Sequence, residues 1–297
     1  MDIALVTGRD EDAAVRAVAA QADGPLRAAL AARGARVHEP VWQDEVDWRA
    51  FDVAVVRTTW DYPQQRDAFV DWAARAGEAT ALWNPADVLR WNTHKGYLLE
   101  LEERGAPVVP TAWLAEGDRV DLAELAAARG WRRVVSKPAV ASGSDGLHRS
   151  DDLADAAAAR AAQDHLDVLL ADHDVLVQPY LPSVESEGEV SVVLVDGEVS
   201  HVVRKRPAAG EYRVQETFGG RYGPLDPDGE GAEPAALARW VVEATGQELL
   251  YARVDLLRDD VGTWQLAELE VTEPDLYLGT VPQAADRLAD AILARGS

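Results

Sequence analysis

The sequence predicts an α/β amino-terminal unit followed by two α+β units. Three observations carry this expectation. The chain has 297 residues, more than one small hydrophobic core normally holds. Strand-like and helix-like segments alternate through the first third, whereas hairpin-like strands dominate the last third. We place the three units at residues 1–93, 94–176 and 177–297.

The amino-terminal unit is expected to be a Rossmann-like, doubly wound parallel sheet. Short apolar runs predict strands at 2–7, 36–42 and 53–59, and Ala/Leu-rich stretches with helical spacing predict helices at 11–33 and 64–76. The first strand is not followed by a G-x-G-x-x-G turn, and the chain has no G-x-x-x-x-G-K-[ST] loop. The sequence therefore excludes that dinucleotide fold and the P-loop enzymes.

The Asn84-Pro85 pair ends this pattern, and the two α+β units follow. The middle unit is expected to contain helices 93–104, 122–129 and 151–171, strands 108–114 and 134–138, and a Gly/Ser loop at 141–147. In the last unit, Asp196-Gly197 is a strong signal for a two-residue hairpin turn. The strands expected there are 189–195, 198–204, 251–258 and 263–271, and the helices that cover them are 233–245 and 282–295.

Charge and composition limit the classes of partner. The formal net charge of −23 excludes nucleic acid, whose binding depends on cations that meet phosphates. The lack of cysteine excludes disulfides, thiolate zinc sites and a cysteine nucleophile. The acidic start MDIALVTGRDEDAAV and the lack of a run of roughly 18 apolar residues predict no signal peptide, no membrane partner and a cytoplasmic location. We expect a small-molecule substrate and leave a homodimer open.

Lysine is scarce in this chain. Lys95, Lys137 and Lys205 are the only lysines among 29 basic residues. In an Arg-rich chain of this kind, lysine drifts to arginine wherever either residue serves. The remaining lysines are therefore candidates for chemistry that needs a compact point charge rather than a planar fork. Chance survival is the alternative at each position.

Two segments have the composition of nucleotide-binding loops. VVSKPAVASGSDGL (134–147) joins a strand, Lys137 and a glycine loop whose backbone N–H groups can close on phosphate oxygens. An ordinary surface hairpin is the alternative. DVLVQPYLPSVESEGEVSV (174–192) is a strand that breaks at Gln178 and can offer backbone groups to a purine edge and a carboxylate to a ribose. A plain crossover between lobes is the alternative there.

Three acids near the carboxyl end form a candidate metal site. Asp255 lies in the apolar strand YARVDLL, and Glu268 and Glu270 lie two residues apart, so both face one side of a neighbouring strand. Acids brought together in this way repel one another unless a cation neutralises them, and hard oxygen ligands suit Mg²⁺. Solvent-facing acids on a half-exposed sheet are the alternative.

These motifs occur in the order found in the ATP-grasp superfamily. The chain resembles most closely its glutathione-synthetase and ribosomal-protein-S6-ligase branch, from about residue 84 to the end, including THKGYLL with Lys95 and the segment GAPVVPT. The resemblance implies an ATP-grasp fold, in which two α+β lobes clasp ATP, with one or two Mg²⁺ ions as cofactor. It also implies a ligase that phosphorylates a substrate carboxylate, which a nitrogen nucleophile then attacks.

The resemblance implies roles for individual residues. Lys95 and Lys137 are expected to hold the ATP phosphates from opposite sides. The glycine loop that closes over them contains Ser142, Gly143, Ser144 and Gly146. The adenine edge is expected to meet Gln178, Tyr180 and Leu181, and the ribose either Glu189 or Glu185. In a larger loop, Arg213 steadies the acyl phosphate and Gly219 and Gly220 approach the γ-phosphate.

The metal ligands implied are Asp255, Glu268 and Glu270. The family usually has Glu-x-Asn at the last pair, so Glu270 is a departure that bears on a second metal ion. We expect Lys205, in HVVRKRP, to reach the nucleotide phosphates or the substrate carboxylate.

Substrate choice is expected at the end of the third predicted strand, because ligands bind open α/β sheets at the carboxyl edge. The residues there are Arg57, Thr58, Thr59, Trp60, Asp61 and Tyr62. Arginine and hydroxyls suit a carboxylate and an acid suits an ammonium, which indicates an amino-acid-like substrate. A structural cap is the alternative for Trp60 and Tyr62.

The whole-chain pattern is similar to the D-cycloserine synthetase group. This resemblance implies an intramolecular cyclo-ligase that converts O-ureido-D-serine to D-cycloserine. Two alternatives are an intermolecular amino-acid or peptide ligase and a non-catalytic nucleotide-binding module. Retention of the lysines and of the three acids argues against the second.

Overall fold

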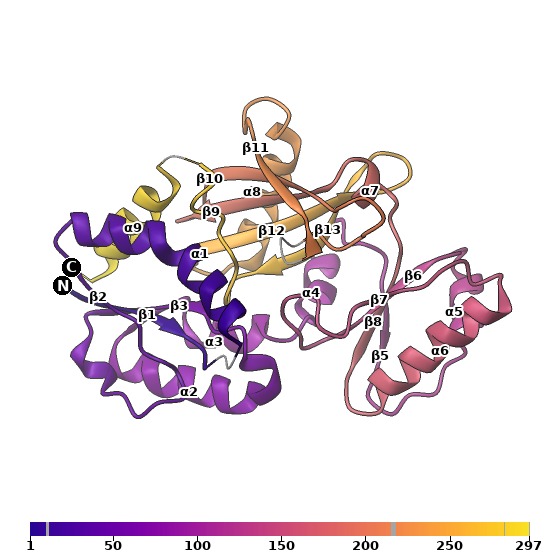
Figure 1. The fold of residues 1–297 in the computed structure, drawn as a ribbon, viewed down its shortest axis with the longest axis horizontal. Coiled ribbons are helices and arrows are strands. Elements are labelled where there is room, and N and C mark those ends of the chain that lie inside the picture. Colours follow the sequence, from indigo (N-terminus) through magenta and orange to yellow (C-terminus); the bar gives the residue numbers. More distant parts are fainter. Residues whose placement is uncertain (10–11, 215–217, 282, 297) are drawn as a thin grey trace.

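The computed structural model describes residues 1–9, 12–214, 218–281 and 283–296, and within them the strands form three sheets (Figure 1). In Figure 1 an N-terminal sheet lies at one end of the molecule, a small sheet at the other, and a five-stranded sheet between them. We call these the N-terminal sheet, the small lobe (residues 112–179) and the central sheet. An α/β unit followed by α+β units is the predicted order.

The N-terminal sheet has the strand order β2-β1-β3-β4 with parallel pairing throughout. Its strands are β1 (Asp2–Thr7), β2 (Arg36–His38), β3 (Val53–Thr58) and β4 (Ala81–Trp83). Every residue of β3 is buried, because α2 (Arg66–Ala79) covers one face while α1 (Ala13–Ala32) and α9 (Ala284–Arg295) cover the other. Short 3-10 turns lie at Trp48–Ala50 and Tyr62–Gln65.

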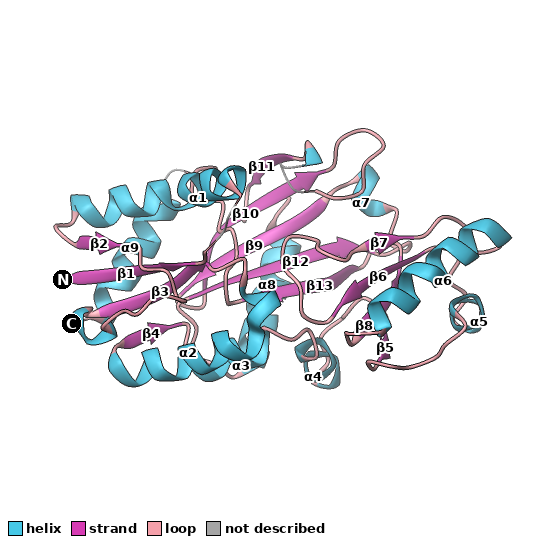
Figure 2. Cartoon of the chain, turned by 60° about the horizontal axis from the view of Figure 1, so that its bottom comes forward, coloured by secondary structure: helices cyan, strands magenta, loops and turns pink. Residues whose placement is uncertain are grey.

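The small lobe is an antiparallel sheet of order β5-β8-β6-β7 with two helices along it (Figure 2). Its elements are β5 (Ala112–Leu114), α5 (Leu122–Ala128), β6 (Val134–Pro138), β7 (His148–Arg149), α6 (Ala156–Leu170) and β8 (Val175–Pro179). Helix α6 begins later than predicted because Asp155 caps it, accepting from the backbone N–H groups of Ala157 and Ala158.

The central sheet is antiparallel and has the order β11-β10-β9-β12-β13. Its strands are β9 (Glu189–Val195), β10 (Glu198–Arg206), β11 (Arg221–Leu225), β12 (Tyr251–Arg258) and β13 (Trp264–Glu270). Asp196 and Gly197 form the predicted turn between β9 and β10, with φ values of 53° and 77°. Helices α4 (Tyr97–Glu103) and α8 (Ala232–Thr245) pack on one face, and α7 (Ser183–Ser186) precedes β9.

A buried joint connects the N-terminal unit to the central sheet. Apolar side chains of β1 and β3 share one core with those of β9, β10 and β12. Asn84 donates from Nδ2 to the carbonyls of Tyr251 and Val271, at 2.9 and 2.7 Å, and its Oδ1 accepts from Leu250 N at 2.7 Å. Asn92, at the end of α3 (Ala86–Asn92), makes similar bonds to Leu269 and Val271. These side chains replace backbone partners that the joined strand ends lack.

Several predicted elements are shorter than expected, for identifiable reasons. The strand predicted at 36–42 ends before Pro40, and the one predicted at 108–114 is interrupted by Pro110, since proline cannot donate to a sheet. The helix predicted from Thr93 begins at Tyr97, because residues 93–96 form a turn in which Lys95 N donates to Ala139 O at 2.8 Å. Elements α3, α7, β4, β7 and β11 were not predicted.

Two predicted helix starts, at Glu11 and Pro282, fall outside the described residues. No helix in the described part of the chain is long and apolar enough to cross a membrane. The predicted division between residues 176 and 177 falls inside β8, which is paired throughout with strands of the small lobe. The three-way division of the chain stays a prediction.

Candidate functional site

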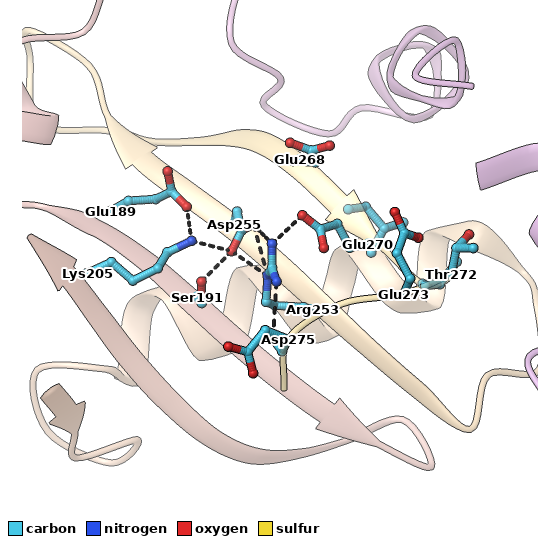
Figure 3. Close-up of polar contacts among 12 residues, drawn as sticks. Glu189, Ser191, Lys205, Arg253, Asp255, Glu268, Glu270, Thr272, Glu273 and Asp275 are labelled. Carbon is cyan, nitrogen blue, oxygen red and sulfur yellow. Dashed lines mark hydrogen bonds and ion pairs between the residues drawn. The ribbon is translucent and has the colours of Figure 1, made fainter. Parts of the chain in front are cut away.

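The three acids predicted as metal ligands lie together on neighbouring strands (Figure 3). Asp255 on β12 is directly opposite Glu268 on β13, and Glu270 lies two residues further along β13. Val254 and Leu269, which alternate with these acids, are buried in the core under α8. The alternation of strand side chains therefore turns the acids to the opposite face of the sheet.

Arg253 lies between the acids, and the sequence analysis missed it. Its Nη2 donates to Asp255 Oδ2 at 2.8 Å and also contacts Glu270 Oε1, while its Nη1 donates to Asp275 O at 3.1 Å (Figure 3). Arg253 precedes Asp255 by two residues on β12, so both side chains share one face. This spacing was a readable signal that the site carries its own cation.

The charges at this site are strongly coupled. Burial acts to raise the pKa of Asp255, yet Arg253 and Lys205 hold it well below its usual range. Burial raises the pKa of Glu270 to about 8, with Glu268 and Asp255 adding to the effect against Arg253. Burial likewise raises the pKa of Glu273 to about 7. The group around Glu270 and Glu273 thus has an excess of buried negative charge.

Of the three lysines, two lie around Glu268. Lys95 Nζ lies 3.2 Å from Glu268 Oε1 and donates to Ala141 O, in the glycine loop, at 2.8 Å. Lys137 lies on β6, and its side chain makes no hydrogen bond or ion pair with any described residue. Burial lowers the pKa of Lys137, and Glu268 opposes that effect. Lys137 therefore carries a charge that nothing in the described chain neutralises directly.

Lys205 differs from the other two lysines. It is buried between two acids, with Nζ in contact with the Glu189 carboxylate and 3.3 Å from Asp255 Oδ1. Burial lowers the pKa of Lys205, but Asp255 and Glu189 outweigh it and hold the pKa well above its usual value. The described contacts of Lys205 are therefore internal, and its predicted contact with phosphate or substrate stays a prediction.

The acids fit Mg²⁺ by chemistry, although they do not surround a metal position as they stand. Carboxylate oxygens are the ligands that Mg²⁺ prefers, and the raised pKa of Glu270 marks charge that a cation would neutralise. Within the described residues, no three acids or histidines have the arrangement of a metal site. Arg253 and Lys205 both bind Asp255, which accounts for this difference. The metal assignment stays a prediction.

The glycine loop is held from two sides. Lys95 contacts its start at Ala141, and Ser142 Oγ donates to Trp60 O, in the N-terminal unit, at 2.8 Å. Ser144 adopts φ 69°. Gly146, with φ 67°, cannot carry a side chain, because a Cβ there would lie 2.7 Å from Pro138 Cγ. The loop therefore bends back against its own strand.

The hinge residues predicted to meet adenine and ribose lie at the end of β8. Gln178 Nε2 donates to Thr111 Oγ1 at 2.9 Å, and Tyr180 and Leu181 are buried. Both candidate ribose acids have cationic partners: Glu185 accepts from Arg149 at 2.8 Å and contacts Tyr180 Oη, and Glu189 pairs with Lys205. The pairing does not separate the two candidates.

The larger loop keeps Arg213 away from the acids on β12 and β13. Arg213 Nη2 donates to Glu211 Oε2 at 2.8 Å, and its guanidinium lies 3.6 Å from the ring centre of Phe218. Gly219 adopts φ 82° and Gly220 follows it before β11. Residues 215–217 of this loop lie outside the described part of the chain.

The predicted substrate residues divide into two groups. Arg57 is 1% exposed and pairs with Asp23 of α1 at 2.9 Å, and Tyr62 packs against Phe69 in the core. Thr59 is also fully buried. We therefore assign Arg57 and Tyr62 a structural role and no longer place them with the substrate. Asp23 was missed, although its helical spacing to Leu26 and Leu30 puts it on the buried face of α1.

Thr58, Trp60 and Asp61 line a cavity of about 270 Å³ between β1, α1 and β3. Thr58 Oγ1 donates to Thr7 Oγ1 at 2.9 Å. Asp61 accepts from Trp42 Nε1 at 3.0 Å and from Arg9 N at 2.8 Å, so its carboxylate already has donors. The cavity lies at the carboxyl edge of the parallel strands, the position expected for a substrate.

Comparisons with known proteins identify relatives of the chain. The family described as D-cycloserine synthetase DcsG, N-terminal domain, matches residues 3–84. The cycloserine biosynthesis protein DcsG of Streptomyces lavendulae is 32% identical over 264 residues, which cover 86% of this chain and 87% of that protein. A glutathione synthetase of Prochlorococcus marinus (strain MIT 9313) is 31% identical over 76% of this chain and 67% of its own length.

Solved structures match the whole chain. The crystal structure of D-cycloserine synthetase DcsG has a TM-score of 0.82 at 30% identity, with each chain covered completely. A D-alanine–D-alanine ligase of Bacillus anthracis complexed with ATP has a TM-score of 0.73 at 16% identity, covering 100% of this chain and 97% of that one. The ATP-grasp ligase PsnB with Mg and ADP has a TM-score of 0.65 at 16% identity, covering 99% and 98%. These matches confirm the predicted ATP-grasp fold.

Proposed function

Since the chain belongs to the D-cycloserine synthetase (DcsG) family, we propose that it is an ATP-dependent ligase that closes a ring within one substrate, converting O-ureido-D-serine to D-cycloserine. The single observation that carries this proposal is the identity of 32% over 86% of the chain. The grouping of Lys95 with Glu268 and the neighbouring acid Asp255 supports it. This chemistry needs no protein nucleophile, which agrees with the absence of cysteine from the chain.

Ring closure has two steps. A carboxylate oxygen of the substrate attacks the γ-phosphorus of ATP, the bond to the bridging oxygen of ADP breaks, and an acyl phosphate forms. The oxygen-bound nitrogen of the ureido group then attacks the acyl carbon and loses its proton, and phosphate leaves with the bonding electron pair. Hydrolysis of the carbamoyl group on that nitrogen, which releases carbon dioxide and ammonia, completes the conversion to D-cycloserine. Because nucleophile and electrophile belong to one molecule, the second step has a high effective concentration.

Lys137 and Lys95 are the proposed phosphate-binding residues. Lys137 has no direct partner among the described residues, so its charge is available to a phosphate oxygen. Lys95 is already directed by Glu268 and by the carbonyl of Ala141, which fixes it beside the glycine loop. Fixed positive charge that meets developing negative charge on the transferred phosphoryl group stabilises the transition state.

Asp255, Glu268 and Glu270 are the proposed Mg²⁺ ligands, together with the phosphates of ATP. A bound Mg²⁺ neutralises phosphate charge and orients the γ-phosphate for in-line attack. The buried acids support this assignment because burial, to which Glu268 and Asp255 add, raises the pKa of Glu270, and a bound cation would favour its ionised form. Arg253 supplies part of the neutralising charge from within the protein.

The remaining proposed roles follow the loops. Gln178, Tyr180 and Leu181 bind the adenine edge, and either Glu185 or Glu189 binds the ribose. Arg213 is proposed to leave Glu211 and meet the acyl phosphate, with Gly219 and Gly220 near the γ-phosphate. Closure of the glycine loop and the larger loop excludes water, which would otherwise hydrolyse the acyl phosphate. A cytoplasmic location and a homodimer stay predictions.

One experiment tests the function directly. Purified protein, Mg-ATP and O-ureido-D-serine, with no added amine, should release phosphate, and mass spectrometry should find a monomeric ring as product. D-serine, which lacks the ureido nitrogen, is the matched control and should give no ring. Phosphate release that requires a second amine, with both molecules joined in the product, would replace the cyclo-ligase by an intermolecular ligase. No phosphate release from any small amino acid would contradict ligase activity.

A further inference from the structure

Trp60 contacts three parts of the molecule at once. Its indole Nε1 donates to Glu273 O, beside the acids of the central sheet, at 2.9 Å. Its carbonyl accepts from Ser142 Oγ, in the glycine loop, at 2.8 Å. The residue also lines the cavity of about 270 Å³ at the edge of the N-terminal sheet. Trp60 is half-buried, and its contacts link the cavity, the glycine loop and the acidic site.

The backbone next to Trp60 is fixed from the N-terminal side. The Asp61 carboxylate accepts from Arg9 N and Trp42 Nε1, which hold it against the turn after β1. That turn requires glycine, because a Cβ on Gly8 would lie 2.0 Å from Asp61 Oδ1. Because the Asp61 carboxylate is held in this way, we expect any movement here to involve the backbone and the indole ring of Trp60.

The glycine loop offers a matching point of contact. Ser142 is half-buried, whereas Gly143 and Asp145 are exposed, so Ser142 is the loop residue that reaches inward to the N-terminal unit. Lys95 holds the adjacent Ala141 carbonyl. The loop is therefore attached through short polar contacts rather than a packed core, and such contacts can form and break with small free-energy changes.

The cavity has the chemistry of an amino-acid site. Its polar lining residues are Thr7, Arg16, Glu39, Thr58, Trp60 and Asp61. Both signs of charge and two hydroxyl groups suit a small zwitterion with further polar groups. Apolar side chains of α1 complete the wall. An occupant of the cavity would therefore contact Trp60 and lie among these charged and hydroxyl-bearing residues.

We propose that Trp60 couples occupancy of this cavity to closure of the glycine loop over ATP. The inference rests on the proposed function, in which the cavity takes part of the amino-acid substrate. An occupant that holds Trp60 in the arrangement seen here favours the Ser142 contact and the closed loop. By linkage, a loop closed on ATP favours the occupied cavity by the same factor. Phosphoryl transfer is then favoured when the substrate is present.

The test measures coupling between two binding sites. The affinity of the Mg complex of a non-hydrolysable ATP analogue is measured by calorimetry with and without saturating O-ureido-D-serine. In the wild type we expect the amino acid to tighten analogue binding on the order of tenfold, within the usual range of such couplings. Trp60→Phe removes the five-membered ring of the indole with its N–H and keeps the backbone carbonyl that Ser142 contacts, whereas Ser142→Ala removes only the hydroxyl. Both are expected to reduce the coupling to within about twofold of none.

A matched control is available in the small lobe. Trp113 Nε1 is buried without a hydrogen-bond partner among the described residues, so Trp113→Phe makes the same chemical change away from the cavity. This variant should keep the wild-type coupling. Wild-type coupling in Trp60→Phe or Ser142→Ala, or none in the wild type, overturns the role of Trp60. Failure of the wild type to release phosphate with O-ureido-D-serine is a separate result, which contradicts the proposed function.

Discussion

The two attachments of the central sheet differ in extent. On one side, the N-terminal unit shares a core with it, and Asn84 and Asn92 bond directly to its backbone. On the other side, the small lobe has a core of its own from residues 112–177, and fewer of its side chains, among them Trp113, Ala139 and Leu176, pack into the core of the central sheet. Its polar contacts with the rest of the molecule include Lys95 with Ala139 and Ala141, and Ser142 with Trp60.

This difference assigns motion to one side of the molecule. Separating the N-terminal unit from the central sheet would expose a shared apolar core and leave the Asn84 partners without hydrogen bonds, which is costly. Displacing the small lobe would expose fewer apolar side chains, because its own core stays intact, and water can replace the polar contacts that it breaks. ATP is therefore expected to be clasped by movement of the small lobe against a single body formed by the other two sheets.

The largest expected effect is a loss of activity when a residue of the small lobe is replaced. Lys137→Ala should lower ATP turnover by about 10²–10³ while leaving the free energy of unfolding nearly unchanged, because Lys137 has no direct partner among the described residues. ADP formation and urea unfolding measure the two quantities. Arg160→Ala, which removes an exposed cation from the same lobe, is the control and should be silent. Turnover at the wild-type rate in folded Lys137→Ala would contradict the phosphate assignment.

At the joint between the N-terminal unit and the central sheet, we expect a substitution to lower stability. Asn84→Ala leaves Leu250 N and the carbonyls of Tyr251 and Val271 without their partner, so the free energy of unfolding should fall by about 2–4 kcal/mol. Urea titration measures this loss. Gln178→Ala, which removes one hydrogen bond from the small lobe, is the comparison and should cost less. Equal losses in the two variants would mean that the two attachments do not differ as described.

Lys205 tests the boundary between the two patterns, because it is buried in the rigid body yet belongs to the charged site. Lys205→Arg keeps the charge but replaces a compact ammonium by a planar fork, so kcat/KM should fall roughly tenfold. Lys205→Met, which leaves Glu189 and Asp255 short of a cation, should also lower stability. A fully active Lys205→Arg would show that the position needs only a charge.

The smallest effect concerns pH and again lies at the joint. His201 is buried, and its Nε2 lies 2.8 Å from Leu276 O. Burial lowers the pKa of His201, and the nearby Arg287 adds to this effect while the Leu276 contact and Asp275 oppose it. The unfolded chain therefore binds the proton more tightly, so stability is full above about pH 6.5 and is lost as pH falls through the folded pKa. Urea unfolding between pH 7 and 5 should show a shallower loss in His201→Gln.

Local periodicity predicted the order of strands and helices and the shared face of the three acids, whereas the ATP-grasp fold was implied by the resemblance. Alternation along the strands places Asp255, Glu268 and Glu270 on one face, and the Asp196-Gly197 turn defines its hairpin. Arg253 follows from the same alternation. It was not among the predicted site residues, because three acids on one face indicate a bound metal as readily as a cation from the chain itself.

The partners of Arg57 could not be predicted in the same way. An arginine at the carboxyl end of a parallel strand has the position of a ligand-binding residue, but α1 brings Asp23 against it from 34 residues earlier in the chain. Such a contact depends on how a helix lies across a sheet, which periodicity does not define. The internal pairing of Lys205 with Glu189 has the same origin, because it depends on the register of β9 and β10.

The hydrogen bonds of Asn84 also bear on how such enzymes can be recombined. The DcsG N-terminal domain match ends at residue 84, the residue whose side chain is bonded to Leu250, Tyr251 and Val271. In a chimera joined at that point, the Asn84 side chain would come from one parent and its three hydrogen-bond partners would come from the other. Exchange of the N-terminal unit between relatives should therefore succeed only when the segments around residues 250 and 271 are transferred together with the first 84 residues.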